Sequence, residues 1–142
     1  MLAKHKFNLE IISPNRVFYA GDVLALSVRT TEGDMGIMHD HQPMVVPISS
    51  GPLNLKFDEK SSRLAALFGG FCQVSLEGDV TIICEHAEWA DEIDKNRAER
   101  AKKRAEERLA KNEAEVDFER ARAALSRAIT RLNISGHNLG GK

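Results

Sequence analysis

The chain has 142 residues, 42% of them hydrophobic and 29% charged, so it can hold one ordinary domain or two small ones and excludes a large catalytic fold. The formal net charge of −1 hides an asymmetry, because residues 1–94 carry 7 Lys and Arg against 14 Asp and Glu, whereas residues 95–133 carry 12 against 7. The basic C-terminal part suggests an acidic partner, which could be polyphosphate, nucleic acid or a protein surface, although a solvated helix surface would have the same composition. No apolar run has the length of a signal peptide or a membrane span, which predicts a cytosolic protein.

From Phe7 to about Ala87, apolar and polar residues alternate with the period of half-buried strands. Turn-forming triplets such as Ser50-Gly51-Pro52 separate the runs, and many short strands at this spacing predict a β sandwich or flattened barrel. The apolar run 64–71 contains two glycines, so we expect a central strand with a bulge or a close backbone approach. Cys72 and Cys84 lie in apolar runs and are expected to be buried thiols.

After Glu88 the pattern changes to that of helices. Asp94 is expected to cap a helix from Lys95 to about residue 111, and Asp117 to cap a second helix ending near residue 133, with Ser135-Gly136 as its stop. The predicted domains are therefore a β domain at 1–88, a linker at 89–94, an antiparallel helical hairpin at 95–133 and a flexible tail at 134–142. The seam between the helices is mostly alanine, which buries little area, so the helices could separate at low cost.

Candidate chemistry is sparse. The glycine-rich phosphate loops and the nucleophile turn are absent. His39-Asp40-His41 could bind a metal or form a polar loop, and with His86 it would be the basis of a metal-dependent β-barrel enzyme. The basic hairpin could belong to a free-standing nucleic-acid-binding module, although it has almost no aromatic residue for base stacking. Trp89 is expected to pack between the two parts.

Arginines of the two predicted helices form a better-defined group. On each helix two of them share a face, and the antiparallel arrangement would let all four converge on a phosphate-bearing ligand, since guanidinium groups match phosphate oxygens. The alternative is that they only solvate alanine-rich helices. The four residues are Arg97, Arg104, Arg127 and Arg131.

Ordered segments from Phe7 to about Leu132 carry a resemblance to a known family. They are Thr31-Glu32-Gly33-Asp34-Met35-Gly36-Ile37, His41-Gln42-Pro43-Met44, Gly51, Gly69-Gly70-Phe71, Ala87-Glu88, Ile93-Asp94 and Asp117-Phe118. In this order and spacing they resemble the epsilon subunits of bacterial F-type ATP synthases.

The resemblance implies a flattened, ten-stranded β sandwich on the central rotor, bound to the gamma subunit and resting on the c-ring. It implies a non-catalytic subunit of an ion-translocating complex, peripheral to the cytoplasmic face of the bacterial plasma membrane, with no catalytic residue and no metal. The hairpin would fold on the sandwich or extend along gamma toward the catalytic alpha and beta subunits, where it would block ATP hydrolysis. The rotor contact segment would comprise Glu32, Gly33, Asp34 and Ile37, with His41 in the same region.

The resemblance also implies a regulatory ATP site on the folded hairpin, used as a sensor and not for hydrolysis. No cofactor is required for the coupling role. The residues that match the ATP-binding pattern of some bacterial members are Glu88, Ile93, Asp94, Arg97, Ala98, Arg104, Arg127 and Arg131.

Overall fold

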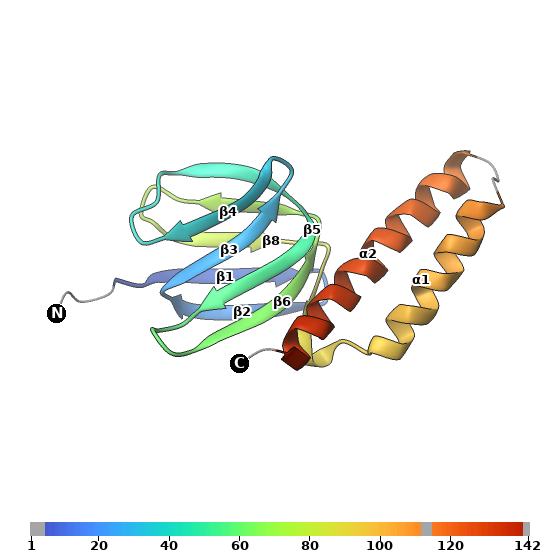
Figure 1. The fold of residues 1–142 in the computed structure, drawn as a ribbon. Helices are drawn as coiled ribbons and strands as arrows, with labels where there is room; N and C mark the ends of the chain where they lie inside the picture. Colours follow the sequence, from blue (N-terminus) through green and yellow to red (C-terminus); the bar gives the residue numbers. More distant parts are fainter. Residues whose placement is uncertain (1–4, 112–114, 141–142) are drawn as a thin grey trace. The chain divides into compact units, whose positions relative to one another are not determined.

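The computed structural model describes residues 5–111 and 115–140 of the chain. The chain divides into two compact units, residues 1–88 and 89–142, of which the first is built of strands and the second of helices (Figure 1). The strands of the described part are β1 (Phe7–Ser13), β2 (Arg16–Val23), β3 (Ala25–Thr30), β4 (Gly33–Met38), β5 (Met44–Lys56), β6 (Ser62–Phe68), β7 (Phe71–Val74), β8 (Val80–Ile83) and β9 (His86–Trp89).

The strands form two sheets that share β5. The first sheet runs β2-β1-β8-β7 and ends on the first part of β5, residues 44–47. The second contains β4, β3, the later part of β5, β6 and β9. The sandwich prediction is therefore confirmed, and because β5 serves both sheets, nine strands supply the ten strand segments that the resemblance implied.

The predicted turn Ser50-Gly51-Pro52 is wrong, because these residues lie inside β5. Val28 of β3 pairs with Leu53, yet Thr30 pairs with Ile48, so Arg29 alone faces four residues of β5. The extra residues bend the strand and carry it from one sheet to the other. Gly51 allows the bend, since a Cβ there would lie 2.9 Å from the Arg29 Cβ.

The apolar run 64–71 is two strands of different sheets and not the predicted single central strand. Gly69 and Gly70 join them with φ angles of 71° and 110°, a region that residues with a Cβ rarely adopt. The expected close backbone approach is confirmed, because a Cβ on Gly70 would lie 2.6 Å from the Cα of Cys84. Leu76, expected in a strand with Val74, is instead 87% exposed after the end of β7.

The core of the β unit consists of the apolar residues that alternate with polar ones along each strand and face inward. The two cysteines are buried free thiols, as expected, and burial raises the pKa of Cys72 to about 11. Side chains with 0% exposure include Leu9, Ile11, Val23, Ile37, Leu53, Leu55, Leu67 and Ile82.

The helical unit begins with a 3-10 turn, Ala90–Glu92, followed by α1 (Lys95–Ala110) and α2 (Glu115–Gly140). The predicted linker at 89–94 is thus partly structured, and the Glu92 carboxylate accepts a hydrogen bond from the backbone N–H of Trp89 at 2.9 Å. The Asp94 cap is confirmed, because its Oδ1 accepts from the Arg97 N–H at 3.0 Å. Within the described ranges, neither helix is long and apolar enough to cross a membrane.

The predicted limits of α2 are wrong at both ends. The helix includes Asp117 in its first turn, where a carboxylate also complements the helix dipole, and it continues through Ser135-Gly136. Ile134 and Ser135 are 3% and 6% exposed, so the buried stripe extends one turn further and outweighs the cost of about 1 kcal/mol for a helical glycine. The predicted tail is therefore helical from 134 to 140, while residues 141–142 and 112–114 lie outside the described residues.

Candidate functional site

The seam between α1 and α2 consists of small side chains, as the sequence predicted. Ala98 and Ala105 of α1 are 3% and 2% exposed, and Ala121 and Ala128 of α2 are each 1% exposed. The two helices run antiparallel (Figure 1). Both helices rise by the same distance per residue, and residue 113 is the midpoint of the connection at 112–114. Ala98 is therefore level with Ala128, and Ala105 with Ala121.

The four predicted arginines lie on one side of this seam. Arg97 and Arg104 each precede a seam alanine of α1 by one residue, and Arg127 precedes Ala128. One residue is a rotation of about 100°, and because the helices run in opposite directions, these rotations turn the three side chains toward the same side. Arg131, three residues after Ala128, lies about 60° from the seam on that side as well. We call it the arginine side.

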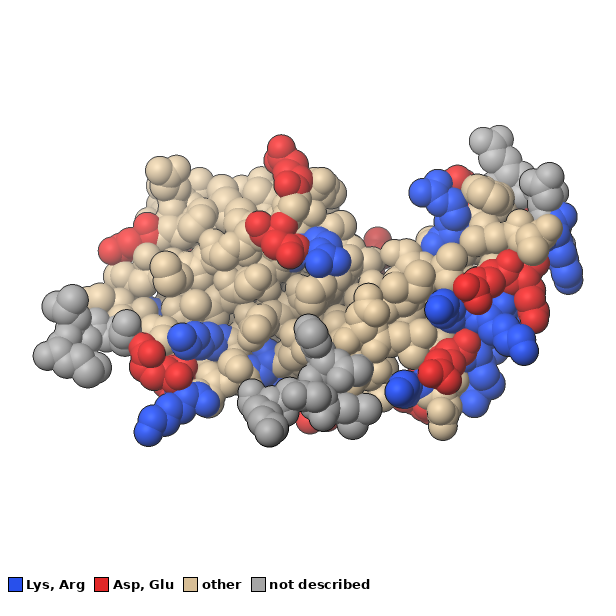
Figure 2. All heavy atoms as spheres, in the orientation of Figure 1, with Lys and Arg blue, Asp and Glu red and all other residues tan. Residues whose placement is uncertain are grey.

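Along the helices, three of the four arginines lie close in level. Arg127 and Arg131 are level with the beginning of α1, within about one turn of Arg97, whereas Arg104 lies about 10 Å further along. Arg97, Arg127 and Arg131 could therefore bind one chain of linked phosphate groups between the two helices. Arg97, Arg104 and Arg127 are exposed, so their guanidinium groups are accessible to a ligand, whereas Arg131 is half-buried and already has an interaction within the protein. On the face drawn in Figure 2, basic side chains gather over the helical unit, with acidic side chains among them.

The remaining residues of the predicted ATP site have different positions. Asp94 is exposed, with its carboxylate committed to capping α1, and Ala98 is buried in the seam. Ile93 is half-buried, and its N–H donates to the Ala90 carbonyl at 3.3 Å. Glu88 belongs to the β unit, where its Oε1 lies 3.1 Å from Nε2 of His86. Seven of the eight predicted residues therefore belong to the helical unit, whereas Glu88 lies in β9.

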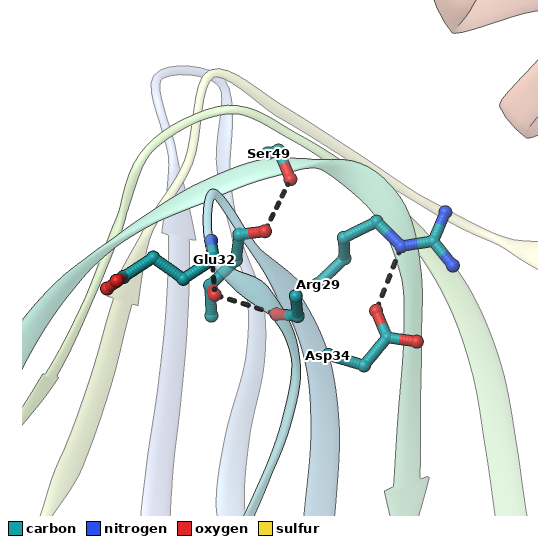
Figure 3. Close-up of polar contacts among 6 residues, drawn as sticks. Arg29, Glu32, Asp34 and Ser49 are labelled. Atoms are coloured by element: carbon teal, nitrogen blue, oxygen red, sulfur yellow. Dashed lines mark hydrogen bonds and ion pairs between the residues drawn. The ribbon is translucent and has the colours of Figure 1, made fainter.

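The predicted rotor contact segment begins at the tight turn between β3 and β4, the β3–β4 tip (Figure 3). Thr30 Oγ1 accepts from the Glu32 N–H at 3.1 Å and donates to the Gly33 carbonyl at 2.7 Å. Ser49 Oγ of β5 donates to the Thr30 carbonyl at 3.0 Å. These bonds fix the backbone of the tip, and the Glu32 carboxylate points away from the other labelled side chains.

An exposed ion pair braces the tip. Arg29 Nε donates to Asp34 Oδ1 at 2.9 Å across the β3–β4 pair. This hydrogen bond holds the pKa of Asp34 below its usual value. The tip therefore presents the Glu32 carboxylate on a hydrogen-bonded turn.

The segment is not one contact surface as predicted. Ile37 has 0% exposure, so it supports the core and offers no surface to a partner. His41 follows the opposite end of β4 from Glu32, and the five residue steps from Gly33 to Met38 separate the ends by about 17 Å. Only Glu32, Gly33 and Asp34 of the predicted set share the tip.

The histidine segment has local contacts only. His39 Nδ1 lies 3.2 Å from Asp40 Oδ2, the His39 ring stacks on His5 with centroids 4.9 Å apart, and His41 Nδ1 lies 2.9 Å from the Gln42 carbonyl. Among residues 5–111 and 115–140, no three His, Cys, Asp or Glu side chains are grouped as metal ligands.

Sequence reasoning missed an exposed apolar row across the outer face of the first sheet. Phe71, Ile83 and Val17 are 57%, 59% and 58% exposed. Directly paired residues share a face, and the register pairs Pro47 with Phe71, Phe71 with Ile83, Ile83 with Ile12, and Ile12 with Val17. The sequence contains a signal for this row. Phe71 and Ile83 are each next to a buried apolar residue in a strand, so the alternation predicts a polar residue at both positions, and both are apolar.

Known families and relatives match most of this chain, including both of its units. A family model described as "ATP synthase, Delta/Epsilon chain, beta-sandwich domain" matches residues 6–90, and one described as "ATP synthase, Delta/Epsilon chain, long alpha-helix domain" matches residues 91–136. A protein of Caldicellulosiruptor bescii named ATP synthase epsilon chain is 44% identical over 133 residues, which cover 94% of this chain and 96% of the relative. A Bacillus velezensis protein of the same name is 43% identical over 129 residues, covering 91% and 96%.

Two solved structures have a similar fold at lower identity. A chain of the mitochondrial ATP synthase of Euglena gracilis, in a structure of its OSCP, F1 and c-ring, has a TM-score of 0.79 at 23% identity and covers 88% of this chain and 78% of its own length. A chain from the central stalk and c-ring of the Tetrahymena thermophila mitochondrial ATP synthase has a TM-score of 0.65 at 15% identity, with 94% and 99% covered.

Proposed function

The chain belongs to the delta/epsilon chain family of ATP synthases, and from that premise we propose that it is a non-catalytic rotor subunit whose helical hairpin binds ATP and inhibits ATP hydrolysis. The observation that carries the regulatory part is the arginine side, where cations from two helices lie over an alanine seam. The complex would place it at the cytoplasmic face of the bacterial plasma membrane. ATP would be a regulatory ligand and no other cofactor is needed.

ATP binding would stabilise the folded hairpin because the hairpin is weakly held by itself. Each seam alanine removes about one methyl group from water, so the four contribute about 3 kcal/mol in total. Helices of the length of α1, 16 residues, are marginal when isolated. A charge-assisted hydrogen bond to phosphate contributes about 1.5 to 3 kcal/mol. Two such contacts would contribute at least as much free energy as the burial of the four seam alanines. A bound triphosphate would therefore shift the equilibrium between separated and paired helices toward the paired state.

Inhibition would follow when the helices leave the folded arrangement. The same basic side chains would then be free to approach acidic segments of the catalytic alpha and beta subunits and oppose rotation in the hydrolysis direction. Deleting residues 95–142 and measuring ATP hydrolysis by the reassembled complex tests this. Increased hydrolysis supports inhibition by the hairpin, and unchanged hydrolysis would confine function to the sandwich.

The apolar row and the β3–β4 tip support the rotor role. An exposed apolar strip of this length is typical of a protein interface, and we assign it to gamma. The exposed Glu32 carboxylate on its braced turn is assigned to the c-ring. Phe71→Ser should weaken gamma association at least about tenfold, the effect of removing one central aromatic contact, while Leu76→Ser, also exposed but in a turn, should not.

The ATP claim is tested by calorimetric titration of the full chain with ATP. Arg127→Ala should reduce affinity by about one to two orders of magnitude, the loss of one charge-assisted contact. Arg100→Ala is the matched control, because Arg100 is exposed on α1 away from the arginine side. Absence of heat between micromolar and millimolar ATP, or equal affinity of both variants, would remove the sensor role.

A further inference from the structure

The arginine side continues well beyond the four arginines of the proposed ATP site. Arg108 follows the seam alanine Ala105 by three residues, Lys111 follows Arg104 by seven, and Arg120 precedes Ala121 by one. By the same rotation they lie on the arginine side. We call these three residues the turn-end cations, because they lie in, or directly next to, the two turns of each helix that are nearest to the connection.

The charge on this side is only partly compensated from within the chain. Arg104, Arg108 and Lys111 follow one another at spacings of four and three residues, at which like charges destabilise a helix. The acidic Glu99 and Glu106 lie one residue after Ala98 and Ala105, which turns them to the opposite side, and Glu107 points away from the seam. Asp117, four residues before Ala121, is turned about 40° from the seam toward the arginine side, so among the described residues of the two helices one carboxylate there faces seven cations. Among the residues that the structure describes, six of the cations form no ion pair and are exposed, and Arg131 is half-buried on the same side. The six are Arg97, Arg104, Arg108, Lys111, Arg120 and Arg127.

The extent of the row exceeds what one nucleotide requires. From Arg97 to Lys111 the cations of α1 span about 21 Å, and those of α2 face them across helices that small residues allow to pack about 8 Å apart. ATP has three phosphoryl groups, and three of the four arginines of the proposed site, Arg97, Arg127 and Arg131, are sufficient to bind them. The turn-end cations are then left without a ligand.

We propose that the whole arginine side binds linear inorganic polyphosphate, a ligand with enough phosphoryl groups to reach from the ATP end to the turn-end cations. Five of the six exposed cations are arginines, whose paired donors match phosphate oxygens. Nucleic acid fits less well, because Phe118, three residues before Ala121, lies on the opposite side and leaves no aromatic platform for a base. The proposal extends the ATP site of the proposed function, yet either can fail alone.

The experiment is calorimetric titration of the full chain with long-chain polyphosphate, tripolyphosphate and ATP at several salt concentrations. Long-chain polyphosphate should bind about tenfold more tightly than tripolyphosphate, because it gains further charge-assisted contacts. Six neutralised phosphates correspond to a slope of log affinity against log salt of about −4, taking about 0.7 per phosphate as for a single strand.

Two triple variants of equal net charge separate the site from general attraction. Arg108→Gln/Lys111→Gln/Arg120→Gln should abolish the advantage of the long chain and reduce the slope to about −2, with ATP binding unchanged. Arg100→Gln/Lys103→Gln/Arg122→Gln removes three exposed cations from other faces and should behave like the unmodified chain. Circular dichroism of both variants verifies that the helices form.

Three results would overturn the proposal. They are equal affinity for long-chain polyphosphate and tripolyphosphate, equal weakening by the two triple variants, and equally tight binding of polyglutamate of similar charge, which would indicate a surface for acidic protein segments. If polyphosphate binds as expected while ATP does not, the ATP sensor fails and this inference stands. If ATP binds and the long chain has no advantage, only this inference fails.

Discussion

Replacing Gly70 by alanine tests whether the crossing between the two sheets depends on a missing side chain. Gly70 has a φ of 110°, which costs a residue with a Cβ about 1 to 2 kcal/mol. Its added Cβ would also meet the backbone of Ile83 and lie 2.6 Å from the Cα of Cys84. Forcing backbone apart in a packed core costs a further 1 to 3 kcal/mol or so. We therefore expect Gly70→Ala to lower the free energy of unfolding of the β unit by about 2 to 5 kcal/mol.

Gly78→Ala is the matched control. Gly78 has a φ of 92°, but a Cβ there would meet nothing within 4 Å, so only the backbone strain of about 1 to 2 kcal/mol applies. The assay is urea unfolding followed by circular dichroism, with amide hydrogen exchange in β7 and β8 to assign the loss to the β unit. Equal destabilisation by the two variants would refute the argument, because it would leave no cost for the close approach.

Three further predictions concern local groups. Asp94→Ala should destabilise the helical unit by about 1 kcal/mol through loss of the α1 cap, detected as a lower thermal midpoint at the helical dichroism band, while Asn96→Ala should have little effect. The pKa of Asp34 is lower in the folded chain than in the unfolded chain, so its pair with Arg29 stabilises the fold above the unfolded pKa, and this stability is lost as pH falls through the folded pKa. Arg29→Met should return the Asp34 carboxyl to an ordinary pKa in an NMR titration. An unchanged pKa would contradict the pairing. Because the pKa of Cys72 is about 11, the thiol should not react with a disulfide reagent at pH 8 until urea unfolds the chain, and rapid labelling of the folded protein would contradict its burial.

The sequence predicted those features that depend on neighbours in the chain. The alternation from Phe7 onward determined the strands, since a half-buried strand needs one apolar face. The Asp94 cap was predictable because its partner, the N–H of Arg97, is three residues away. Helical rotation alone places Arg97, Arg104 and Arg127 on one side of the hairpin. This part of the candidate site was therefore also predictable from the sequence.

Features that depend on distant pairing were not predictable. The residues around Gly51 have turn-forming preferences, yet pairing with β3 and β6 keeps them in a strand. Gly136 has the preference of a helix stop, yet burial of Ile134 and Ser135 extends α2 past it. Likewise, Glu32 and His41 are close in sequence, and only the straight path of β4 between them places them at opposite ends of a strand.

Strand β5 has a mechanical consequence, because one covalent chain runs through both layers of the sandwich. Two sheets held together only by side-chain packing could slide over each other at the cost of repacking. Here any shear between the layers must strain the bend at Gly51 or unpair β5 from β3, β6 or β7. A tangential force applied to one sheet is therefore transmitted to the other through peptide bonds and ladder hydrogen bonds, a stiffness that the proposed rotor role would require.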